Sequence, residues 1–390
     1  MQLGLANEEL QRLPSGFKFV TTNINGIEPG EMIVRLLAVG ICGTDKQMIR
    51  QERADSAAVI GHEGVGSILL AGAGVSGFSA GQLVVFNPVN PHDQDLVLGH
   101  STSGLLQTYR VISEAEISHG LVLQVDLPCA TELGILAEPL GAAIYAHELI
   151  AKYTNVEKLA IVGGGPEGLL SALYALGNLG REVFLVHNES SRLDWIAGQE
   201  ILHREKMFLD SDRLASEILA ATRGRGVDAT IVCTSRRGSL AALSKALLYT
   251  RNEGCINLTV GFDSNDRLGE LPDVDLGAIR RRNVCGHPVE GFASRHRVSG
   301  RNLYLTGHRG TSRTHILQAI ETLTANPKSY SRLITHRIPF SGAAQFLEFL
   351  AKSRHPCCYE QRQIIKPVID FSDTTRHYDR EKVTTAFPVQ

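Results

Sequence analysis

The chain has 390 residues, of which 43% are hydrophobic and 21% are charged, and its formal net charge at pH 7 is −2. This length is comfortable for two domains, each large enough to bury its own core. A net charge so close to zero argues against a general binder of nucleic acid or of a membrane surface. The seven cysteines are scattered and odd in number, which favours a reducing compartment, and residues 1–16 lack the apolar section of a signal peptide. We therefore expect a cytoplasmic, globular protein.

The first part of the chain has the pattern of a β-rich lobe. Short runs rich in β-branched and apolar residues, separated by Gly, Pro and Asp, occur at 31–39, 58–60, 65–70 and 82–87. No helix is predicted before Leu133, because apolar residues first take helical spacing between residues 132 and 152. We place the end of the first part of this domain at residue 153.

Strand-like and helix-like segments then alternate. Apolar strands are predicted at 158–162, 182–186, 228–233 and 255–260, and helical spacing follows the first three at 166–179, 191–202 and 238–250. This alternation predicts a doubly wound parallel sheet. We assign residues 154–310 to this α/β domain. Residues 311–371, with helices at 315–324 and 341–352 and a last strand near 363–369, return to the first lobe, and 372–390 form a C-terminal tail.

A glycine-rich motif joins the first strand of the α/β domain to its helix, and it reads GGGPEG from Gly163 to Gly168. In this position a dinucleotide-binding loop is expected: Gly163 makes the tight turn, Gly165 lets the backbone approach a pyrophosphate, and Gly168 lets the helix pack closely. Pro166 suits the first helical turn, and Glu167 completes the loop. The alternative is a glycine-rich turn that binds no ligand.

The second strand of a dinucleotide-binding domain usually ends in an acid that holds the adenosine ribose, but here His187 and Asn188 follow the strand. A carboxylate would repel a 2'-phosphate, whereas His187, Asn188 or Arg192 would accept it, so the sequence favours NADP(H) over NAD. Two alternatives stay open: Glu189 reaches the ribose, or Arg192 is only a solvated helix residue.

Three short motifs carry the residue types of a catalytic zinc site. Cys42 opens the segment CGTD, His62 and Glu63 follow twenty residues later, and Glu138 stands at the approach to the second domain. A thiolate, an imidazole and carboxylates are ligands that Zn²⁺ takes when one position stays open, and Asp45 is placed to orient the imidazole. Taken singly, such residues are more often a core cysteine, a surface histidine and an ordinary helix start. Their combination ahead of the glycine-rich loop favours the zinc site.

With these motifs in this order, the sequence resembles the zinc-dependent medium-chain dehydrogenase/reductase family over residues 31–369. The matching segments read AVGICGTD at 38–45, GHEGVG at 61–66, AEPL at 137–140 and GGGPEG at 163–168. The resemblance implies a GroES-like, β-rich catalytic domain made from both chain ends and a central Rossmann domain. It also implies zinc bound by Cys42, His62 and either Glu63 or Glu138. A glutamate at position 138 is similar to the polyol and sugar dehydrogenases.

The resemblance further implies an NAD(P)-dependent oxidoreductase that interconverts a secondary alcohol and a ketone on a sugar, polyol or cyclitol. The expected catalytic residues are Cys42, Thr44, His62, Glu63 and Glu138. Thr44 matches the hydroxyl residue that passes the substrate proton to the coenzyme ribose, but Gln47, which cannot titrate, follows where a histidine often continues the relay. The alternatives are a zinc-free enone or quinone reductase, which would have lost the metal ligands, and a non-catalytic binding protein of the same fold.

Two regions depart from the family. The family's structural zinc needs four cysteines close together, whereas residues 86–109 contain none, so we expect one catalytic ion and no structural zinc. His92, Asp93 and His100 form an imaginable substitute site, although isolated loop histidines are more often solvated.

The second region is basic: from Arg280 to His315 there are eight arginines and one acid, Glu290. One hypothesis is that some of these arginines hold an anionic substrate such as a sugar phosphate. The alternative is a solvated loop or a subunit interface in a homodimer or homotetramer.

Overall fold

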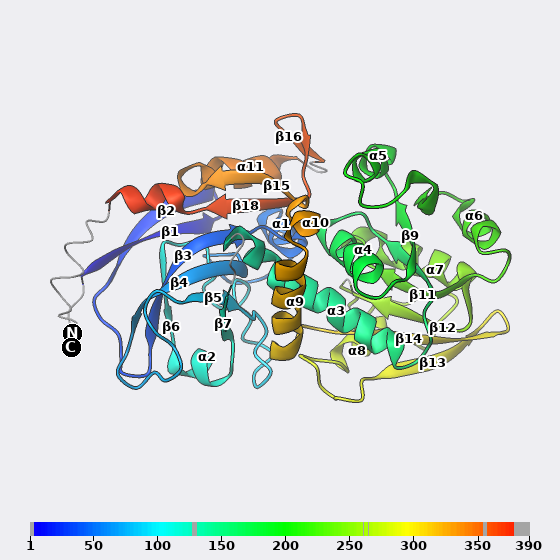
Figure 1. Cartoon of the computed structure of the whole chain (residues 1–390), viewed down its shortest axis with the longest axis horizontal. Helices are drawn as coiled ribbons and strands as arrows, with labels where there is room; N and C mark the ends of the chain where they lie inside the picture. Colours follow the sequence, from blue (N-terminus) through cyan, green and yellow to red (C-terminus); the bar gives the residue numbers. More distant parts are fainter. Residues whose placement is uncertain (1–3, 127–130, 260, 264, 354–356, 378–390) are drawn as a thin grey trace.

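The computed structural model describes residues 4–377 apart from 127–130, 260, 264 and 354–356. Two lobes lie side by side (Figure 1): a β-rich lobe formed by both ends of the described chain, and an α/β lobe formed by its middle. The strands of the main β-rich sheet come from residues 32–125 and 334–370, and those of the α/β sheet from residues 158–307. The predicted fold class is confirmed.

One mixed sheet organises the β-rich lobe. Its strand order is β15-β18-β3-β4-β5-β7, and β6 also pairs with β3. The strands are β3 (Met32–Gly40), β4 (Glu63–Ala71), β5 (Leu83–Phe86), β6 (Tyr109–Ile112), β7 (Val122–Val125), β15 (Ile334–Pro339) and β18 (Lys366–Asp370). β18 runs antiparallel to β3 and thereby ties the returning chain to its first part. Two hairpins complete the lobe, β1 (Leu5–Leu13) with β2 (Gly16–Ile24), and β16 (Cys358–Tyr359) with β17 (Arg362–Gln363).

The β-rich lobe also contains helices α1 (Gly43–Ile49), α2 (Glu114–Ser118) and α11 (Ala343–Lys352). The expectation of no helix before residue 133 is therefore wrong. α1 and α2 are short, and each is held by a capping box, formed by Cys42 with Asp45 and by Ser113 with Glu116. Such reciprocal hydrogen bonds stabilise helices that are too short to show an apolar period.

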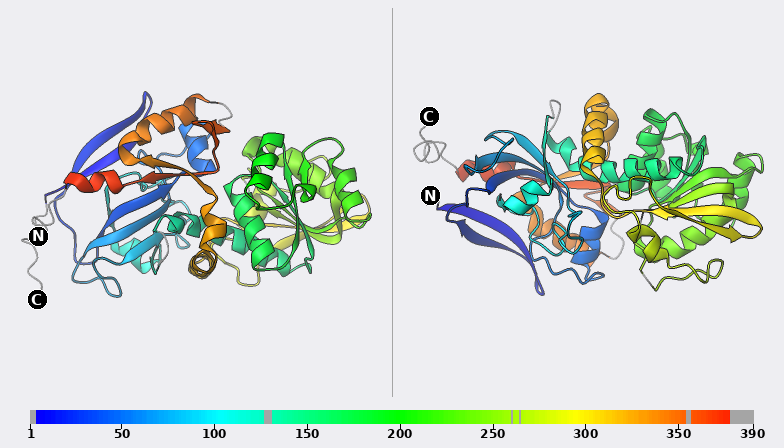
Figure 2. Two further views of the ribbon diagram at one scale, coloured as in Figure 1. Left: turned by 45° about the horizontal axis from the view of Figure 1, so that its top comes forward. Right: turned by 90° about the horizontal axis from the view of Figure 1, so that it is seen from below.

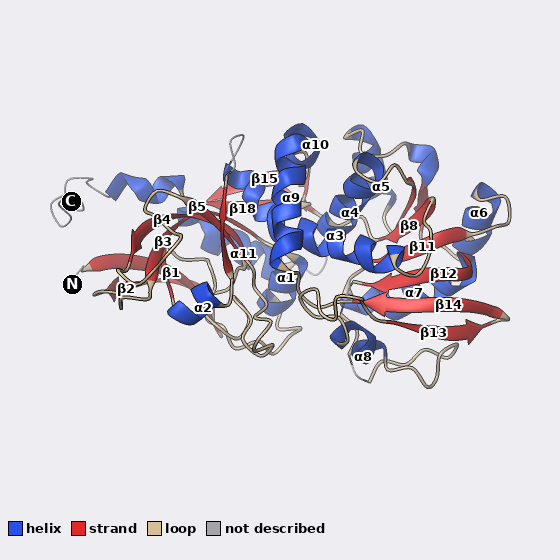
Figure 3. Ribbon diagram, turned by 60° about the horizontal axis from the view of Figure 1, so that its bottom comes forward, coloured by secondary structure: helices blue, strands red, loops and turns tan. Residues whose placement is uncertain are grey.

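The α/β lobe has the strand order β10-β9-β8-β11-β12-β14-β13, and its strands are parallel except for β13. They are β8 (Lys158–Val162), β9 (Glu182–His187), β10 (Met207–Leu209), β11 (Val227–Val232), β12 (Thr250–Leu258), β13 (Ala293–Val298) and β14 (Arg301–Gly307). Helices pack around this sheet (Figure 3), namely α4 (Pro166–Gly177), α5 (Ser190–Gly198), α6 (Leu214–Ala221), α7 (Ser239–Tyr249) and α8 (Leu276–Arg281). The strand order reverses between β8 and β11, and ligands of such sheets bind at the carboxyl ends of the strands beside this switch point.

Helices α3 (Ala137–Ala151) and α9 (Arg313–Ala325) lie between the lobes, and α10 (Pro327–Ser331) follows α9. Figure 2 shows the same arrangement from two further sides. Among the described residues, the helical stretch 132–151 is the one candidate for a membrane span by length and composition, yet 89% of its apolar window is buried inside the molecule. It serves as a core helix that joins the two lobes.

Candidate metal and coenzyme site

Cys42 caps the N-terminus of α1. Its sulfur accepts hydrogen bonds from the backbone N–H groups of Thr44 at 3.2 Å and Asp45 at 3.3 Å, and it lies 2.6 Å from the Thr44 hydroxyl. The Asp45 carboxylate in return accepts the backbone N–H of Cys42 at 2.9 Å. Burial, followed by the charge of Asp45, raises the pKa of the Cys42 thiol. A metal ion bound to the sulfur would act in the opposite direction and favour the thiolate.

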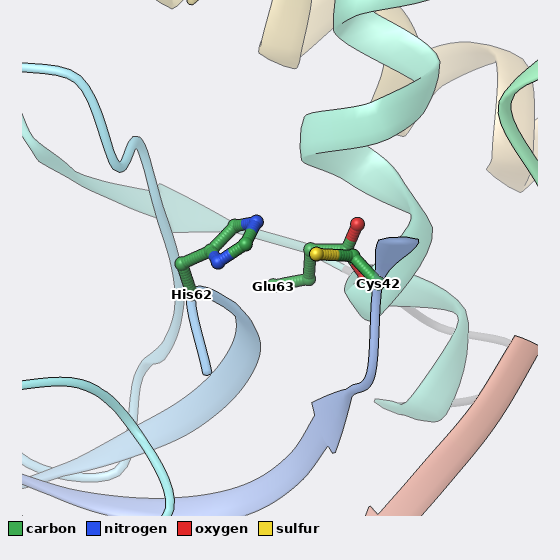
Figure 4. A group of neighbouring side chains, drawn as sticks. All are labelled: Cys42, His62 and Glu63. Atoms are coloured by element: carbon green, nitrogen blue, oxygen red, sulfur yellow. The ribbon is translucent and has the colours of Figure 1, made fainter. Parts of the chain in front are cut away.

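Cys42, His62 and Glu63 come together in the interior of the β-rich lobe. One ligand atom from each lies within 4.8 Å of the others, and Figure 4 shows the His62 ring pointing toward the sulfur of Cys42. Within the described part of the chain this is the one such group of three or more metal-ligating residue types. The register of the sheet explains the meeting, because β3 and β4 pair with Gly40 opposite Glu63.

Glu63 forms a buried ion pair with Lys366, the first residue of β18. Burial by itself lowers the pKa of Lys366, but the charge of Glu63 and then that of Cys42 raise it, and the net direction is upward. Sequence reasoning missed Lys366, because the two residues are separated by 303 positions and no local pattern links them. The ammonium group holds the Glu63 carboxylate in place.

The site has an excess of acidic groups. Burial raises the pKa of Glu138, at the start of α3, and that of Glu167, in the glycine-rich loop, each to about 7, and the charge of Glu63 acts on both in the same direction. Glu138 lies outside the compact group of three, so Glu63 is the closer carboxylate to Cys42 and His62.

Two buried polar atoms beside the group lack a hydrogen-bond partner among the described residues, His62 Nδ1 and Asp45 Oδ1, which are 3.7 Å apart. Burial lowers the pKa of His62, but the charges of Cys42 and Asp45 outweigh it and raise the pKa well above its usual value. The site therefore favours positive charge. Sulfur, imidazole and carboxylate donors around such a point fit a zinc ion.

The glycine-rich loop connects β8 to α4 at the switch point. Gly163 has a φ of +129°, which a residue with a side chain rarely adopts, and a side chain at position 168 would meet the Gly163 carbonyl oxygen at 1.9 Å. Gly165 is the N-cap of α4 without a side-chain cap, and Pro166 is the first helical residue. A side chain at Gly165 would meet nothing within 4 Å. The N-terminus of α4 is thus open to a pyrophosphate.

The residues predicted to meet the adenosine ribose lie beside this loop. His187 Nδ1 accepts the Gly164 N–H at 3.2 Å, and burial, followed by the charge of Arg192, lowers the pKa of His187 to about 4, so it is neutral at pH 7. Arg192 donates to the Gly164 carbonyl at 3.2 Å, to Gln363 at 3.0 Å and to the Ile364 carbonyl at 3.1 Å. Asn188 is exposed. Two of the three predicted residues are therefore already engaged in protein contacts.

The known proteins that are similar to this chain include dehydrogenases, which agrees with a site for a metal and a coenzyme. Residues 28–121 match the alcohol dehydrogenase GroES-like domain. The chain is 26% identical over 363 residues to an L-threonine 3-dehydrogenase of Bacillus licheniformis, covering 87% of this chain and 93% of that protein. It is 27% identical over 282 residues to a sorbitol dehydrogenase of Bombyx mori, covering 67% and 77%. The galactitol-1-phosphate dehydrogenase structure from Escherichia coli superposes with a TM-score of 0.69 at 18% identity, covering 95% of this chain and all of that one.

These relatives are similar to this chain over most of its length, and residues 28–121 carry the domain found in alcohol dehydrogenases, so the chain is similar to the zinc-dependent medium-chain dehydrogenase/reductase family. This likeness confirms the predicted resemblance and supports an oxidoreductase of the alcohol dehydrogenase type. The metal-ligating residue types that a zinc-free reductase would have lost are all kept, and three of them lie together.

The loop 87–103 is the region in which the sequence predicts no structural zinc. Asn87 Nδ2 donates to the Thr311 carbonyl at 2.9 Å and Ser101 Oγ accepts the Val97 N–H at 2.8 Å, so local hydrogen bonds hold the loop. His92 lies against His119 with ring centroids 4.5 Å apart. The imagined substitute site of His92, Asp93 and His100 does not form among the described residues.

His100 instead belongs to the surroundings of the metal group, which sequence reasoning missed. Its ring centroid lies 5.0 Å from that of His62, and its Nδ1 lies 3.4 Å from an oxygen of Asp55. Asp55 accepts in turn from Arg53 at 2.8 Å. A line of polar side chains therefore runs from the metal group toward the rim of the lobe.

Proposed function

We propose that this protein is a zinc-dependent NAD(P) oxidoreductase that interconverts a secondary alcohol and a ketone on a sugar, polyol or cyclitol-like substrate. The observation that carries the proposal is the position of Glu167. This residue belongs to the coenzyme loop, yet Glu63 of the metal group and Lys366 both act on its pKa. Metal group and coenzyme loop therefore lie close enough for their charges to interact, as hydride exchange between substrate and coenzyme requires. The likeness to a sorbitol dehydrogenase supports a polyhydroxylated substrate.

In this proposal Cys42 and His62 hold a single zinc ion, with Glu63 as the nearest carboxylate and Glu138 as the next. When bound there, zinc supplies a Lewis acid for the substrate oxygen. The positive charge of the metal would also offset the excess negative charge of the acidic groups in the site. No second, structural ion is proposed, because the loop 87–103 has no cysteine.

The side chains of the site have separate tasks. Lys366 fixes the Glu63 carboxylate by its buried ion pair, and Asp45 fixes the Cys42 backbone. The Thr44 hydroxyl, beside the Cys42 sulfur, would take the proton of the substrate hydroxyl and pass it toward the coenzyme. Glu138, with a pKa of about 7, can hold or release a proton near neutral pH.

We further propose NADP(H) as the preferred coenzyme, whose nicotinamide ring supplies hydride exchange. Gly163, Gly165 and Gly168 shape the loop for its pyrophosphate, with Pro166 and Glu167 at the start of α4. β9 ends in the neutral His187 and not in a carboxylate, so the strand lacks the terminal acid that would repel a 2'-phosphate.

The test is metal analysis of the purified protein together with a panel of polyols, sugar acids and ketoses, each with NAD(H) and NADP(H). We expect about one zinc per chain and turnover of a polyhydroxylated compound that is lost on chelation and restored by zinc. Equal turnover by the zinc-free protein would refute the zinc mechanism. Binding of coenzyme without turnover of any secondary alcohol would refute the activity.

We also propose that the protein works in the cytoplasm as a homodimer or homotetramer, without nucleic-acid or membrane partners. β13, the outermost strand of the α/β sheet, has an edge without a strand partner among the described residues, and an unpaired edge is a surface that a second subunit can extend. Light scattering would give the mass in solution, and a monomer would contradict this part.

A further inference from the structure

The arginine-rich segment divides into two groups in the structure. Arg281 pairs with Asp275 at 3.5 Å, and Arg295 pairs with Glu253. Arg282 lies over the Phe292 ring at 4.3 Å. Arg301 donates to backbone carbonyls at the end of α7, and Arg297 and Arg313 are exposed. Most of the segment is therefore structural or solvated, and two arginines are left: Arg280 and Arg309.

Arg280 lies over the carboxyl edge of the α/β sheet. Its Nε donates to the His308 carbonyl at 3.1 Å. A side chain at Gly307, the last residue of β14, would meet Arg280 Cγ at 3.0 Å, and one at Gly261, shortly after β12, would meet its Nη1 at 3.7 Å. This edge is where sheets of this kind bind their ligands.

Arg309 reaches across to the β-rich lobe, where its Nη2 donates to the Gln94 carbonyl at 3.0 Å. Burial lowers the pKa of Arg280 to about 10, and the charges of Arg309 and of Arg53 act in the same direction against that of Glu167. The charges of Arg309 and of Arg53, which comes from the β-rich lobe, therefore both reach Arg280, whose Nε contacts the residue before Arg309. Arg53 has Asp55 as its partner, but the described residues include no ion pair to Arg280 or Arg309.

Arg53 and Arg280 are each linked to the metal group. Asp55, the partner of Arg53, lies 3.4 Å from His100, whose ring lies against His62. From the other lobe, Glu167 acts electrostatically on Arg280 and is itself acted on by Glu63. Arg280 is therefore linked electrostatically to the reacting centre, and it contacts the carbonyl of His308, the residue that precedes Arg309. A substrate that carried its own acid group would supply the missing counter-charge.

We propose that Arg280 and Arg309 form the subsite for the acid group of an anionic polyhydroxylated substrate, whose secondary hydroxyl reaches the metal group. This inference rests on the proposed function. Guanidinium groups bind carboxylate and phosphate by the same paired, charge-assisted hydrogen bonds, so a sugar acid and a sugar phosphate both fit the chemistry.

The experiment compares matched substrates with the zinc-loaded enzyme: L-idonate against L-iditol, and galactitol 1-phosphate against galactitol. We expect the wild-type enzyme to prefer one acidic member over its neutral partner by at least about 10-fold in kcat/KM. Arg280→Gln and Arg309→Gln should each lower kcat/KM for that acid by about 10- to 100-fold, with little change for the neutral compound. Which acid responds separates carboxylate from phosphate recognition.

Arg281→Gln is the matched control, because Arg281 is on the same helix and already has Asp275 as a partner; it should leave the preference unchanged. Arg280→Lys, with thermal melting of each variant, separates loss of charge from loss of fold. NADPH binding, followed by its fluorescence, should be the same in all variants. Equal losses on acid and neutral substrates together with weaker NADPH binding would overturn the inference and assign Arg280 to the coenzyme.

Turnover of neutral polyols without any preference for the acids would overturn this inference alone. Turnover of none of the four compounds or of the wider panel would remove the proposed function and the inference with it. Added KCl gives a further check: it should raise KM for the acid more steeply than for the neutral partner, because salt screens the arginine charges. A KM for the acid that does not respond to salt contradicts the subsite.

Discussion

The metal group and the coenzyme loop lie within electrostatic reach of each other but are built in opposite ways. In the metal group, buried charged side chains form the site, and one of these charges is balanced within the protein, that of Glu63 by Lys366. In the coenzyme loop, the coenzyme would contact backbone atoms, and a side chain at Gly165 would meet nothing within 4 Å. The metal group should therefore be sensitive to substitutions that change charge. The coenzyme loop should be sensitive to substitutions that change side-chain volume.

The largest expected effect is the loss of a ligand in the metal group. Cys42→Ser and His62→Ala should each lower kcat by at least about 10³-fold, because a bound metal contributes several kcal/mol to stabilising charge on the substrate oxygen. Elemental analysis should show loss of zinc, with the circular dichroism spectrum unchanged. Cys358→Ser, at an exposed cysteine, is the control and should keep both metal and activity. Full activity in the zinc-free Cys42 variant would contradict the assignment.

The next largest effect is expected from breaking the buried ion pair of Glu63 and Lys366 while Cys42 and His62 are kept. In the zinc-free protein, Lys366→Met leaves Glu63 buried without its ion-pair partner and should cost about 3–5 kcal/mol in the free energy of unfolding. Glu63→Gln in the same chain should recover part of that loss. Lys352→Met, which breaks the exposed pair with Glu348, should cost less than about 1 kcal/mol. Urea unfolding measures all of these.

The pH dependence of this pair has a definite sign. The pKa of Lys366 is raised in the folded protein, so the pair contributes its full stability below the unfolded pKa of about 10.4 and loses it as the pH rises through the folded value. The stability difference between wild type and Lys366→Met should therefore be the same at pH 7 and pH 9. A difference that shrinks between these values would contradict a charged Lys366.

The same contrast explains what the sequence could reveal. Strand and helix alternation, the glycine-rich loop and the meeting of Cys42 with His62 were predictable, because periodicity and short motifs record local geometry. Lys366 was not, because its partner is 303 positions away. The β13–β14 hairpin was also missed, although its turn at Ser299 and Gly300, both with positive φ, is a recognisable signal. Charged residues on β13 hid its strand pattern.

A volume change in the coenzyme loop should act without any change of charge. Gly168→Ala places a methyl group against the Gly163 carbonyl oxygen, and such overpacking should cost about 1–3 kcal/mol, seen as weaker NADPH binding, a lower melting temperature or both. Gly177→Ala is the matched control in the same helix, since a side chain there meets nothing within 4 Å. It should be neutral or slightly stabilising. Equal NADPH binding and equal melting temperatures in the two variants would mean that the loop tolerates a side chain at position 168.

The smallest expected effect tests whether any side chain of the coenzyme region carries specificity. His187→Asp puts a carboxylate at the end of β9 and should lower the ratio of kcat/KM for NADP(H) over NAD(H) by about 10-fold or more. An aspartate can still accept the Gly164 N–H that His187 accepts now, so binding of NAD(H) should survive. His203→Asp, at an exposed position, gives the same charge change as a control. An unchanged ratio in the His187 variant would mean that the end of β9 does not determine the coenzyme preference. The exposed residues that follow β9 would then determine it.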